Sequence, residues 1–332
     1  MTYVVAIDNG SQSTKVSVVD ASGRVHAFAQ VPLRPYEHPA PGHVVHPGDD
    51  VWESIAAACT AALAGFGGDP AEIVAVGLCT IRFCRALLRA DGTLAEPMLS
   101  WMDDRVSAPH RLTPGVRWVT TSSGYVTRRL TGEWRDTAAN YQGVWPIDQA
   151  TWRWPAGADP YTATGMAREQ LFELVDPGDL LGTVTSDAAA RTGLPVGLPV
   201  FATANDKAVE ALGCGLREET LLSLGTYIAA MTTGDELMTE TGGAFWTNFA
   251  SVPGRYLYES NGIRRGMWTI TWFRNLLGDL VGAGPDLDAG AAAVPAGSGG
   301  LVTVLDWLAP TDHPHRRGAL LGFDGTQGRF HV

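Results

Sequence analysis

The chain has 332 residues, of which 45% are hydrophobic and 18% charged, and its formal net charge is -11. This length and composition allow one large domain or two ordinary ones with a well-buried core, and they argue against extensive disorder. The acidic balance without a basic stripe argues against a nucleic-acid partner, and no apolar stretch reaches the ~18 residues of a membrane helix.

The first predicted element is a strand at residues 3–8, followed after a polar turn by a second strand at residues 15–20. Because the strand pattern starts this early and carries an acidic residue, we expect no signal peptide. A third strand is predicted at residues 24–33, a helix from about Asp50 and a buried strand at residues 72–80. This order indicates an α/β domain with a mixed sheet.

The same order recurs in the second half of the chain. Residues 219–234 again fit a strand, a polar glycine turn and a strand, and residues 255–260 fit a third strand. A helix is predicted at residues 266–280 and a following strand at residues 300–308. We therefore predict two domains of repeated architecture, with a boundary at residues 217–220.

The sequence has four cysteines: Cys59, Cys79, Cys84 and Cys214. They lie in apolar surroundings, so we expect buried free thiols in a reducing cytoplasm. A metal or redox pair of Cys79 and Cys84 is the alternative. His43 and His46 lie in a Pro-Gly loop and are predicted to be surface histidines rather than metal ligands.

The turn between the first two strands, residues 8–15, carries groups that a simple hairpin does not need. Gly10 permits a positive φ and a close backbone approach, and the hydroxyls and amides around it can donate to phosphate oxygens. Asp8 can hold Mg²⁺ directly or through water, because hard cations prefer oxygen ligands. The alternative is a polar hairpin turn whose aspartate hydrogen-bonds its own turn.

Two further segments carry candidate chemistry. Residues 223–226, Ser-Leu-Gly-Thr, form the equivalent turn of the second half, and two such turns indicate a nucleotide held between two lobes. A strand at about residue 200 runs into Asn205-Asp206-Lys207 and then into a helix of small residues. Asp206 at this junction can accept a proton from a substrate hydroxyl during phosphoryl transfer. The alternative is that Asp206 only caps the helix.

Taken together, these segments resemble the FGGY family of carbohydrate kinases, of the xylulose- and glycerol-kinase kind. The matches run in family order over nearly the whole chain: residues 8–15 and 223–226 as the phosphate loops, Pro41-Gly42, 92–105 as the hairpin ending in Trp-x-Asp-x-Arg, 128–136 as the Leu-Thr-Gly segment, Asp206 as the catalytic base, and 300–323. The combination is far more specific than any single motif.

The resemblance implies an α/β, actin-like (RNase H-like) fold with two lobes, and it implies ATP, Mg²⁺ and a sugar or polyol acceptor. Residues 1–217 would form the N-terminal lobe, which binds sugar and phosphate, and residues 218–332 an incomplete C-terminal lobe. Carried over by position, Asp8 would serve the metal and Asp206 would be the general base. The phosphates would lie near Ser11, Gln12, Ser13, Lys15, Gly225 and Thr226, and the sugar near Arg82, Phe83, Trp101, Asp103 and Arg105.

The chain departs from the family pattern in places that bear on the substrate. Phe83 stands where xylulose-type pockets carry a histidine, and Ala138-Ala139-Asn140 replaces a Ser-Asp-Ala run. A lost polar partner changes specificity by a large factor, so a pentulose such as xylulose is only the nearest expectation. The stretch between Arg105 and Tyr125 is also shorter than usual.

The sequence stops at Val332, where the family continues into a Gly-rich adenosine site. We therefore expect an exposed strand edge and apolar face that favour a partner, either a second copy of the chain or a complementing fragment. The main hypothesis is an ATP-dependent carbohydrate kinase. The alternative is a non-catalytic sugar-binding or interaction protein derived from a kinase, and a weaker one is an actin-like ATPase of chaperone or cytoskeletal type.

Overall fold

The computed structural model describes residues 2–215, 219–225, 227–281, 286–309, 313 and 315–332. The chain divides into two compact units. The first comprises Met1–Gly215, Thr233–Leu237 and Asn248–Leu257, and the second comprises Leu216–Thr232, Met238–Thr247 and Tyr258–Val332.

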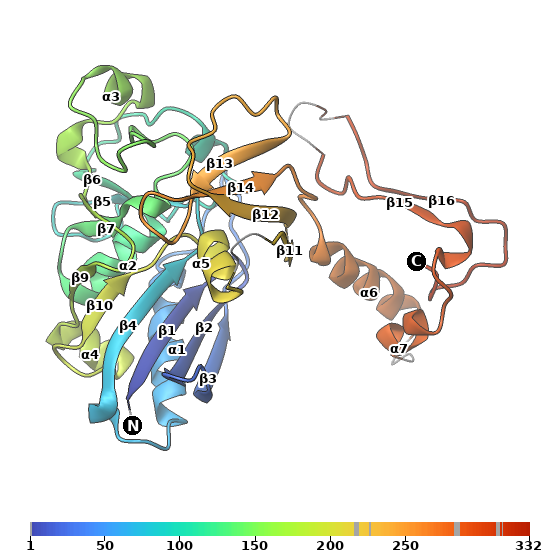
Figure 1. Ribbon diagram of the computed structural model, residues 1–332, viewed down its shortest axis with the longest axis horizontal. Helices are drawn as coiled ribbons and strands as arrows, with labels where there is room; N and C mark the ends of the chain where they lie inside the picture. Colours follow the sequence, from blue (N-terminus) through green and yellow to red (C-terminus); the bar gives the residue numbers. More distant parts are fainter. Residues whose placement is uncertain (1, 216–218, 226, 282–285, 310–312, 314) are drawn as a thin grey trace. The chain divides into compact units, whose positions relative to one another are not determined.

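A six-stranded sheet in the order β3-β2-β1-β4-β10-β9 forms the framework of the first unit (Figure 1). Its strands are β1 (Tyr3–Asn9), β2 (Ser13–Asp20), β3 (Val25–Pro32), β4 (Ile73–Thr80), β9 (Leu180–Thr183) and β10 (Pro199–Ala202). β1 pairs antiparallel with β2 and parallel with β4, and β10 pairs parallel with β4. These parallel and antiparallel pairs confirm the predicted mixed sheet. Apolar residues alternate along β1 and β2, so one face of the sheet is buried.

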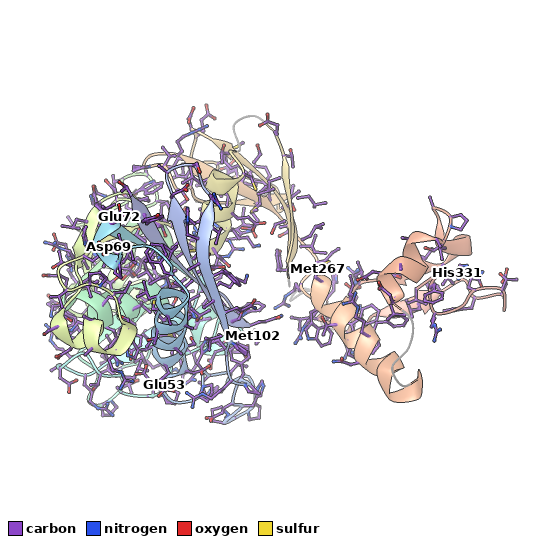
Figure 2. The ribbon with its side chains drawn as sticks, turned by 90° about the horizontal axis from the view of Figure 1, so that it is seen from below. Glu53, Asp69, Glu72, Met102, Met267 and His331 are labelled. Carbon is purple, nitrogen blue, oxygen red and sulfur yellow. The ribbon has the colours of Figure 1, made fainter. Side chains whose placement is uncertain are left out.

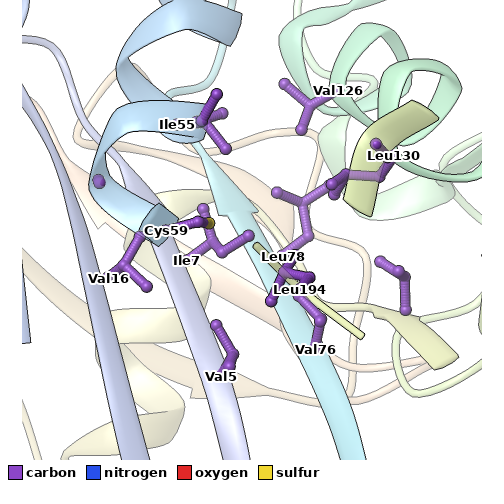
Figure 3. Close-up of a cluster of buried hydrophobic side chains, with 14 of the residues drawn as sticks. Val5, Ile7, Val16, Ile55, Cys59, Val76, Leu78, Val126, Leu130 and Leu194 are labelled. Carbon is purple, nitrogen blue, oxygen red and sulfur yellow. The ribbon is translucent and has the colours of Figure 1, made fainter. Parts of the chain in front are cut away.

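The core of the first unit lies between this sheet and three helices: α1 (Asp50–Ala64), α2 (Ser122–Thr131) and α4 (Ser186–Thr192). Figure 3 shows the contact, in which helix side chains meet those of the strands: Ile55, Cys59, Val126 and Leu130 against Val5, Ile7, Val16, Val76 and Leu78. Burying one such aliphatic side chain stabilises the fold by roughly 1.5–3 kcal/mol. The strand ends that carry polar residues are therefore held on a rigid layer.

Smaller elements complete the first unit: β5 (Arg85–Leu88), β6 (Trp118–Thr121), β7 (Arg135–Thr137), β8 (Glu173–Val175), α3 (Asp159–Thr164), α5 (Asp206–Gly213) and the 3₁₀ turns η1 (Pro70–Glu72), η2 (Asp104–Ser107), η3 (Ala138–Asn140) and η4 (Arg168–Gln170). β5 pairs antiparallel with β6, and β7 pairs parallel with β8. Asp69, labelled in Figure 2, caps η1 by accepting from the Ala71 amide, and this turn leads into β4.

A second sheet has the strand order β11-β12-β14-β13. Its strands are β11 (Leu221–Leu224), β12 (Ile228–Gly234), β13 (Phe245–Phe249) and β14 (Tyr256–Ser260), and the elements that follow are α6 (Met267–Val281), α7 (Leu287–Ala292), η5 (Ser298–Gly300), β15 (Val302–Val304) and β16 (Ala319–Leu321). The helix predicted at residues 266–280 is confirmed by α6. β13 was not predicted.

The strand predicted at residues 300–308 is only partly right. β15 spans three residues and pairs antiparallel with β16, so in the described residues it belongs to a separate two-stranded sheet. A partner fewer than 20 residues away closes a short loop, whereas pairing with a distant strand costs more loop entropy. Among the described residues, the repeat of the first half's plan therefore extends only as far as α6.

Burial corrects two expectations. Cys59, Cys79 and Cys84 are buried free thiols as predicted, but Cys214 is exposed because it follows α5 at its C-terminal end. His46 is buried rather than on the surface, and burial lowers its pKa to about 4. In the described part of the chain no three His, Cys, Asp or Glu residues are grouped to hold a metal ion, and no helix there is long and apolar enough to cross a membrane.

Candidate active site

The β1–β2 hairpin holds its polar turn on helix α1. Asn9 lies opposite Thr14, and its side-chain Nδ2 donates to Thr14 Oγ1 at 2.7 Å. Thr14 Oγ1 is in turn 2.7 Å from Ser54 Oγ on α1. All three side chains are buried, so this hydrogen-bonded chain fixes the turn from below.

The outer side of the same turn is open. Gly10 donates its N–H to Ser13 O at 3.1 Å and is not among the glycines with positive φ, so the turn does not use the positive φ that a glycine permits. A Cβ placed on Gly10 would meet only Ser13 O, at the ordinary contact distance of 3.5 Å. The absence of a side chain is therefore not needed for folding and leaves the backbone accessible.

The polar residues of the turn have defined anchors. Ser11 O accepts from the Tyr36 hydroxyl at 3.0 Å, and Gln12 O accepts from the amide of residue 33 at 2.9 Å. Ser13 Oγ accepts from the amide side chain of residue 30 at 2.9 Å. Gln12 and Lys15 are exposed, whereas Ser11 and Ser13 are half-buried. This set of hydroxyl, amide and ammonium groups is chemically suited to anionic oxygens.

Asp8 is half-exposed and forms a cross-strand ion pair with Lys15, at 3.7 Å between Oδ2 and Nζ. Asp8 is thus paired with the opposite strand, whereas the alternative prediction was a hydrogen bond from Asp8 to its own turn. One accessible carboxylate beside this polar turn fits Mg²⁺, which is commonly held by one or two carboxylates together with water and substrate phosphates. Asp8 is the residue of this hairpin that can hold such an ion.

Asp206 is the first residue of α5, and Asn205 is the N-cap of that helix. Asn205 Oδ1 accepts from the Ala208 amide at 3.2 Å, so the alternative in which Asp206 caps the helix is wrong. The Asp206 carboxylate accepts from the Lys207 amide at 3.0 Å, and its side chain is 31% exposed. The cap therefore fixes the helix start while the Asp206 side chain stays accessible.

The two candidate carboxylates lie at the same edge of the sheet. Cys79 on β4 is in register with Asp8 on β1. Its pKa is raised well above the ordinary value, first by burial and then by the negative charges of Asp206 and Asp8. β10 pairs parallel with β4 and is followed by Asp206, so both carboxylates lie at the carboxyl ends of parallel strands, where open α/β sheets bind ligands.

Arg82 borders Asp206, and Phe83 borders Arg82. Arg82 Nε is 3.6 Å from Asp206 Oδ1, and the Arg82 guanidinium lies 5.2 Å from the centre of the Phe83 ring. Phe83 has φ of 64°, a left-handed conformation that is costly for an aromatic residue and that persists only where the surroundings enforce it. Its ring lies 3.4 Å from where a Cβ of Gly143 would be. The structure thus brings the predicted substrate residue Arg82 to the predicted base and places Phe83 against Arg82.

The Trp-x-Asp-x-Arg segment is firmly held by the protein itself. Asp103 is buried and accepts from the Val44 amide at 2.8 Å and from the Arg105 amide and guanidinium at 2.8–3.0 Å. Burial acts to raise its pKa, but these bonds outweigh it and lower the pKa. Arg105 also lies 3.6 Å from Glu96, and Trp101 packs on the core. Arg105 thus does the structural pairing expected of a charge beside a carboxylate.

The second predicted phosphate turn connects β11 and β12. Leu224 is opposite Ile228, so Gly225 lies in the turn, and its carbonyl accepts from the Met267 amide at the start of α6 at 3.1 Å. Ser223 is buried. Thr226 lies outside the described residues.

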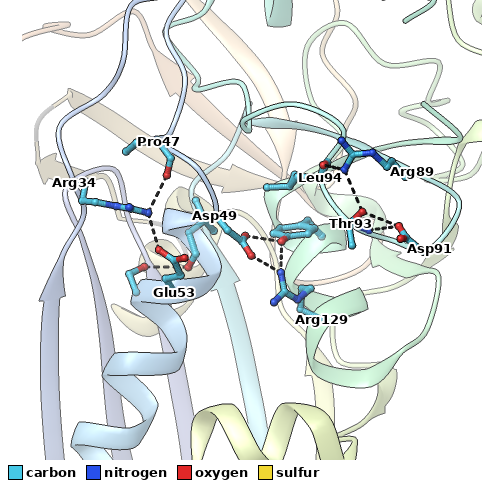
Figure 4. A network of polar contacts seen from close by, with 12 residues as sticks. Arg34, Pro47, Asp49, Glu53, Arg89, Asp91, Thr93, Leu94 and Arg129 are labelled. Carbon is cyan, nitrogen blue, oxygen red and sulfur yellow. Dashed lines mark hydrogen bonds and ion pairs between the residues drawn. The ribbon is translucent and has the colours of Figure 1, made fainter. Parts of the chain in front are cut away.

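A separate cavity of about 840 Å³ lies in the first unit, between the start of α1, residues 91–97, α2 and α4. Figure 4 shows the polar network at its wall, in which Asp49 accepts from the Tyr125 hydroxyl and from Arg129. None of the predicted site residues lines it.

Sequence reasoning missed the residues that position the site. The roles of Asn205 and Thr14 within their quoted segments, and the residue Ser54, were not predicted: Asn205 caps α5, and Thr14 bonds to Ser54 on α1. An asparagine just before a helix of small residues is a capping signal that could have identified Asn205. Ser54 is recognisable only once the hairpin is known to pack on α1.

Comparison with known proteins agrees with this geometry. The family model for the N-terminal domain of the FGGY family of carbohydrate kinases matches residues 3–113. The chain is 44% identical over 336 residues to the uncharacterized sugar kinase YgcE of Escherichia coli (strain K12), covering 98% of this chain and 68% of that protein. It is 27% identical to a glycerol kinase of Methylibium petroleiphilum, covering 97% of this chain and 73% of that one.

Solved structures show the same fold. The xylulose kinase from Rhodospirillum rubrum has a TM-score of 0.78 at 23% identity, and the gluconate kinase from Lactobacillus acidophilus has a TM-score of 0.80 at 17% identity. In each case 99% of this chain and 74% of the other are covered. The chain belongs to the FGGY family of carbohydrate kinases. The predicted family, carbohydrate-kinase class and actin-like fold are confirmed, and the chain is shorter than these relatives.

Proposed function

We propose that this protein transfers the terminal phosphoryl group of ATP to a hydroxyl of a sugar or polyol, with Asp206 as general base. A pentulose such as xylulose is the nearest candidate. The observation that carries the proposal is the placement of Asp8 and Asp206 at the carboxyl ends of the parallel strands β1 and β10, on either side of β4 and beside an open polar hairpin.

In this proposal Asp206 accepts the proton of the attacking hydroxyl, and the hairpin orients the phosphates by its backbone and its polar side chains. The residues that would lie near phosphate are Ser11, Gln12, Ser13, Lys15, Gly225 and Thr226. Asp8 would hold Mg²⁺, which when bound neutralises charge on the transferring phosphoryl group. Residues 1–217 and 218–332 would be the N-terminal and C-terminal kinase lobes, and the use of ATP would place the protein in the cytoplasm.

The acceptor would lie against the side chains that border the base. Arg82 supports this because its guanidinium lies 3.6 Å from Asp206 and can orient the carboxylate. Phe83 supplies an apolar face beside it. Trp101 and Arg105 would contact the sugar, with Asp103 holding Arg105 in place.

The test is ADP release from ATP and Mg²⁺ with a panel of pentuloses, hexuloses and polyols. Asp206→Asn should abolish the sugar-dependent rate, whereas Asp187→Asn, the same change in the first turn of α4 at an exposed position, should leave it unaltered. Equal rates in wild type and Asp206→Asn would refute the role of Asp206. Sugar binding without turnover would favour the alternative of a non-catalytic sugar-binding protein.

We also propose a partner, either a second copy of this chain or a complementing fragment. β11 is the terminal strand of its sheet, and Leu222 and Leu224 on it are 57% and 59% exposed. An apolar strand at a sheet edge favours pairing with another chain. Light scattering of the purified protein across a concentration series tests this, and a monomer at every concentration would contradict the second-copy form.

A further inference from the structure

Two successive carbonyls of the β1–β2 turn accept hydrogen bonds from the segment that follows β3. The Tyr36 hydroxyl donates to Ser11 O at 3.0 Å, and the Leu33 amide donates to Gln12 O at 2.9 Å. Leu33 directly follows the last residue of β3, and Tyr36 lies three residues further on. Both donors belong to one stretch of chain, so both carbonyls of the turn point toward it.

These two bonds also fix the direction of the neighbouring N–H groups. A trans peptide unit is planar, and its C=O and N–H point in opposite directions. No cis peptide bond occurs among the described residues. The N–H of Gln12 therefore points away from Tyr36, and the N–H of Ser13 points away from Leu33. Tyr36 thus sets the direction of an N–H group in the turn through the carbonyl on the other side of the same peptide unit.

Tyr36 is itself firmly supported by the fold. Its neighbour Glu37 exchanges two backbone hydrogen bonds with Val45, each 3.0 Å long, and Val45 is buried. The Tyr36 ring meets the ring of His46 edge-on, at 4.9 Å between centroids, and His46 is also buried. The chain therefore holds the hydroxyl in place without help from a ligand.

The hydroxyl of Tyr36 acts only on the outer side of the turn. Burial raises the pKa of Tyr36 well above its ordinary value, so the phenol stays protonated and remains a donor. The inner side is held separately, by the hydrogen bonds that link Asn9, Thr14 and Ser54. Loss of the Tyr36 hydroxyl should therefore release the Ser11 carbonyl and leave the hairpin folded.

We infer that Tyr36 is a positioning residue for phosphate: its hydroxyl holds the Ser11–Gln12 peptide unit so that the Gln12 N–H faces a phosphate oxygen of bound ATP. Backbone N–H groups attract an anion, whereas a carbonyl oxygen turned toward it repels it. Without the hydroxyl this peptide unit is free to rotate and lose the favourable orientation. The inference rests on the proposed function and assigns a role in it to a residue outside the turn.

The experiment compares Tyr36→Phe with the matched control Tyr161→Phe. Tyr161 lies on α3, and its hydroxyl donates to the carbonyl of Pro155 at 2.7 Å, so each variant loses one bond of the same kind. Calorimetry with ATP and Mg²⁺ in the absence of sugar measures ATP affinity, and ADP release measures KM for ATP and for the acceptor.

We expect Tyr36→Phe to bind ATP roughly tenfold more weakly than the wild type and to raise KM for ATP by a similar factor. Its KM for the acceptor should stay unchanged, because the turn would face the phosphates and not the acceptor. Tyr161→Phe should match the wild type in ATP affinity and in both KM values. A merely structural role of the Tyr36 hydroxyl would not separate ATP from the acceptor in this way.

Three results would overturn the inference: ATP affinity of Tyr36→Phe equal to that of the wild type, an equal weakening for ATP and acceptor, and no ATP binding by the wild type. If Tyr36→Phe fails to fold, amide hydrogen exchange of the wild type decides, since ATP should slow exchange of the Gln12 N–H and an unchanged rate would overturn the inference. ATP binding that depends on Tyr36, with no sugar-dependent ADP release, would refute the proposed function and leave this inference standing.

Discussion

Replacing Gly10 with alanine separates folding from phosphate binding. The structure gives Gly10 an ordinary backbone conformation, and the added Cβ would meet only Ser13 O at 3.5 Å. The free energy of unfolding should therefore stay within about 1 kcal/mol of the wild type, with a small gain from the stiffer unfolded chain. The methyl group would instead occupy the open side of the turn, where the proposed phosphates approach.

The activity of Gly10→Ala should fall much more than its stability. Losing one backbone contact to a charge that develops in the reaction costs roughly 10²- to 10³-fold in kcat. The assay pairs urea unfolding, followed by circular dichroism, with sugar-dependent ADP release. Stability near the wild type with a rate reduced about a hundredfold is the expected result.

Gly165→Ala is the matched control. Gly165 has φ of 68°, and a Cβ there would lie 2.1 Å from His110 O. The same chemical change should therefore destabilise the fold by about 1–3 kcal/mol or more through backbone strain, far from the hairpin. Full turnover by Gly10→Ala would refute the phosphate-loop argument, and unfolding of Gly10→Ala would refute the described turn geometry.

Three further outcomes are expected. Asp206→Asn should reduce sugar-dependent turnover by roughly 10²- to 10⁴-fold while its circular dichroism spectrum stays unchanged, because Asn205 caps the helix; a helix loss would contradict this. Burial raises the pKa of Asp136 to about 6, so the folded state holds the Asp136 proton more tightly than the unfolded state does. The stability that the protonated side chain contributes is therefore lost as pH rises from about 4 through 6. The urea midpoint of the wild type minus that of Asp136→Asn should fall across this pH range, and a difference that does not change with pH would refute the prediction. Asp103→Ala leaves Arg105 without its buried partner and should cost about 3 kcal/mol by urea unfolding, and a loss under ~1 kcal/mol would show that water replaces the carboxylate.

The hairpin at Asp8 could be predicted because its evidence is local. Alternation in β1 and β2 sets the register, and the polar turn between them follows from it. The choice between Asn205 and Asp206 as helix cap could not be made, because both residue types cap well and only the backbone geometry decides. The role of each residue as a ligand stays a prediction.

Other features depend on contacts between distant residues. His46 is buried because its ring packs on Tyr36 at 4.9 Å between centroids and lies 3.8 Å from Cys84 Sγ, whereas its Pro-Gly loop reads as surface. The buried amide of Asn140, which has no hydrogen-bond partner among the described residues, is likewise visible only after folding encloses it. Composition and spacing carry no information about such enclosure.

Three of the four cysteines are buried and one is exposed, so a thiol reagent should label the protein at a single site. Burial raises the pKa of Cys59 and Cys84 to about 12 and that of Cys79 well above its ordinary value, and thiols held protonated out of solvent react slowly with maleimides. Cys214 alone among the four is exposed, and it lies at the end of the helix that begins with Asp206. A fluorophore attached to the unmodified sequence would therefore sit at one defined position, at the end of that helix.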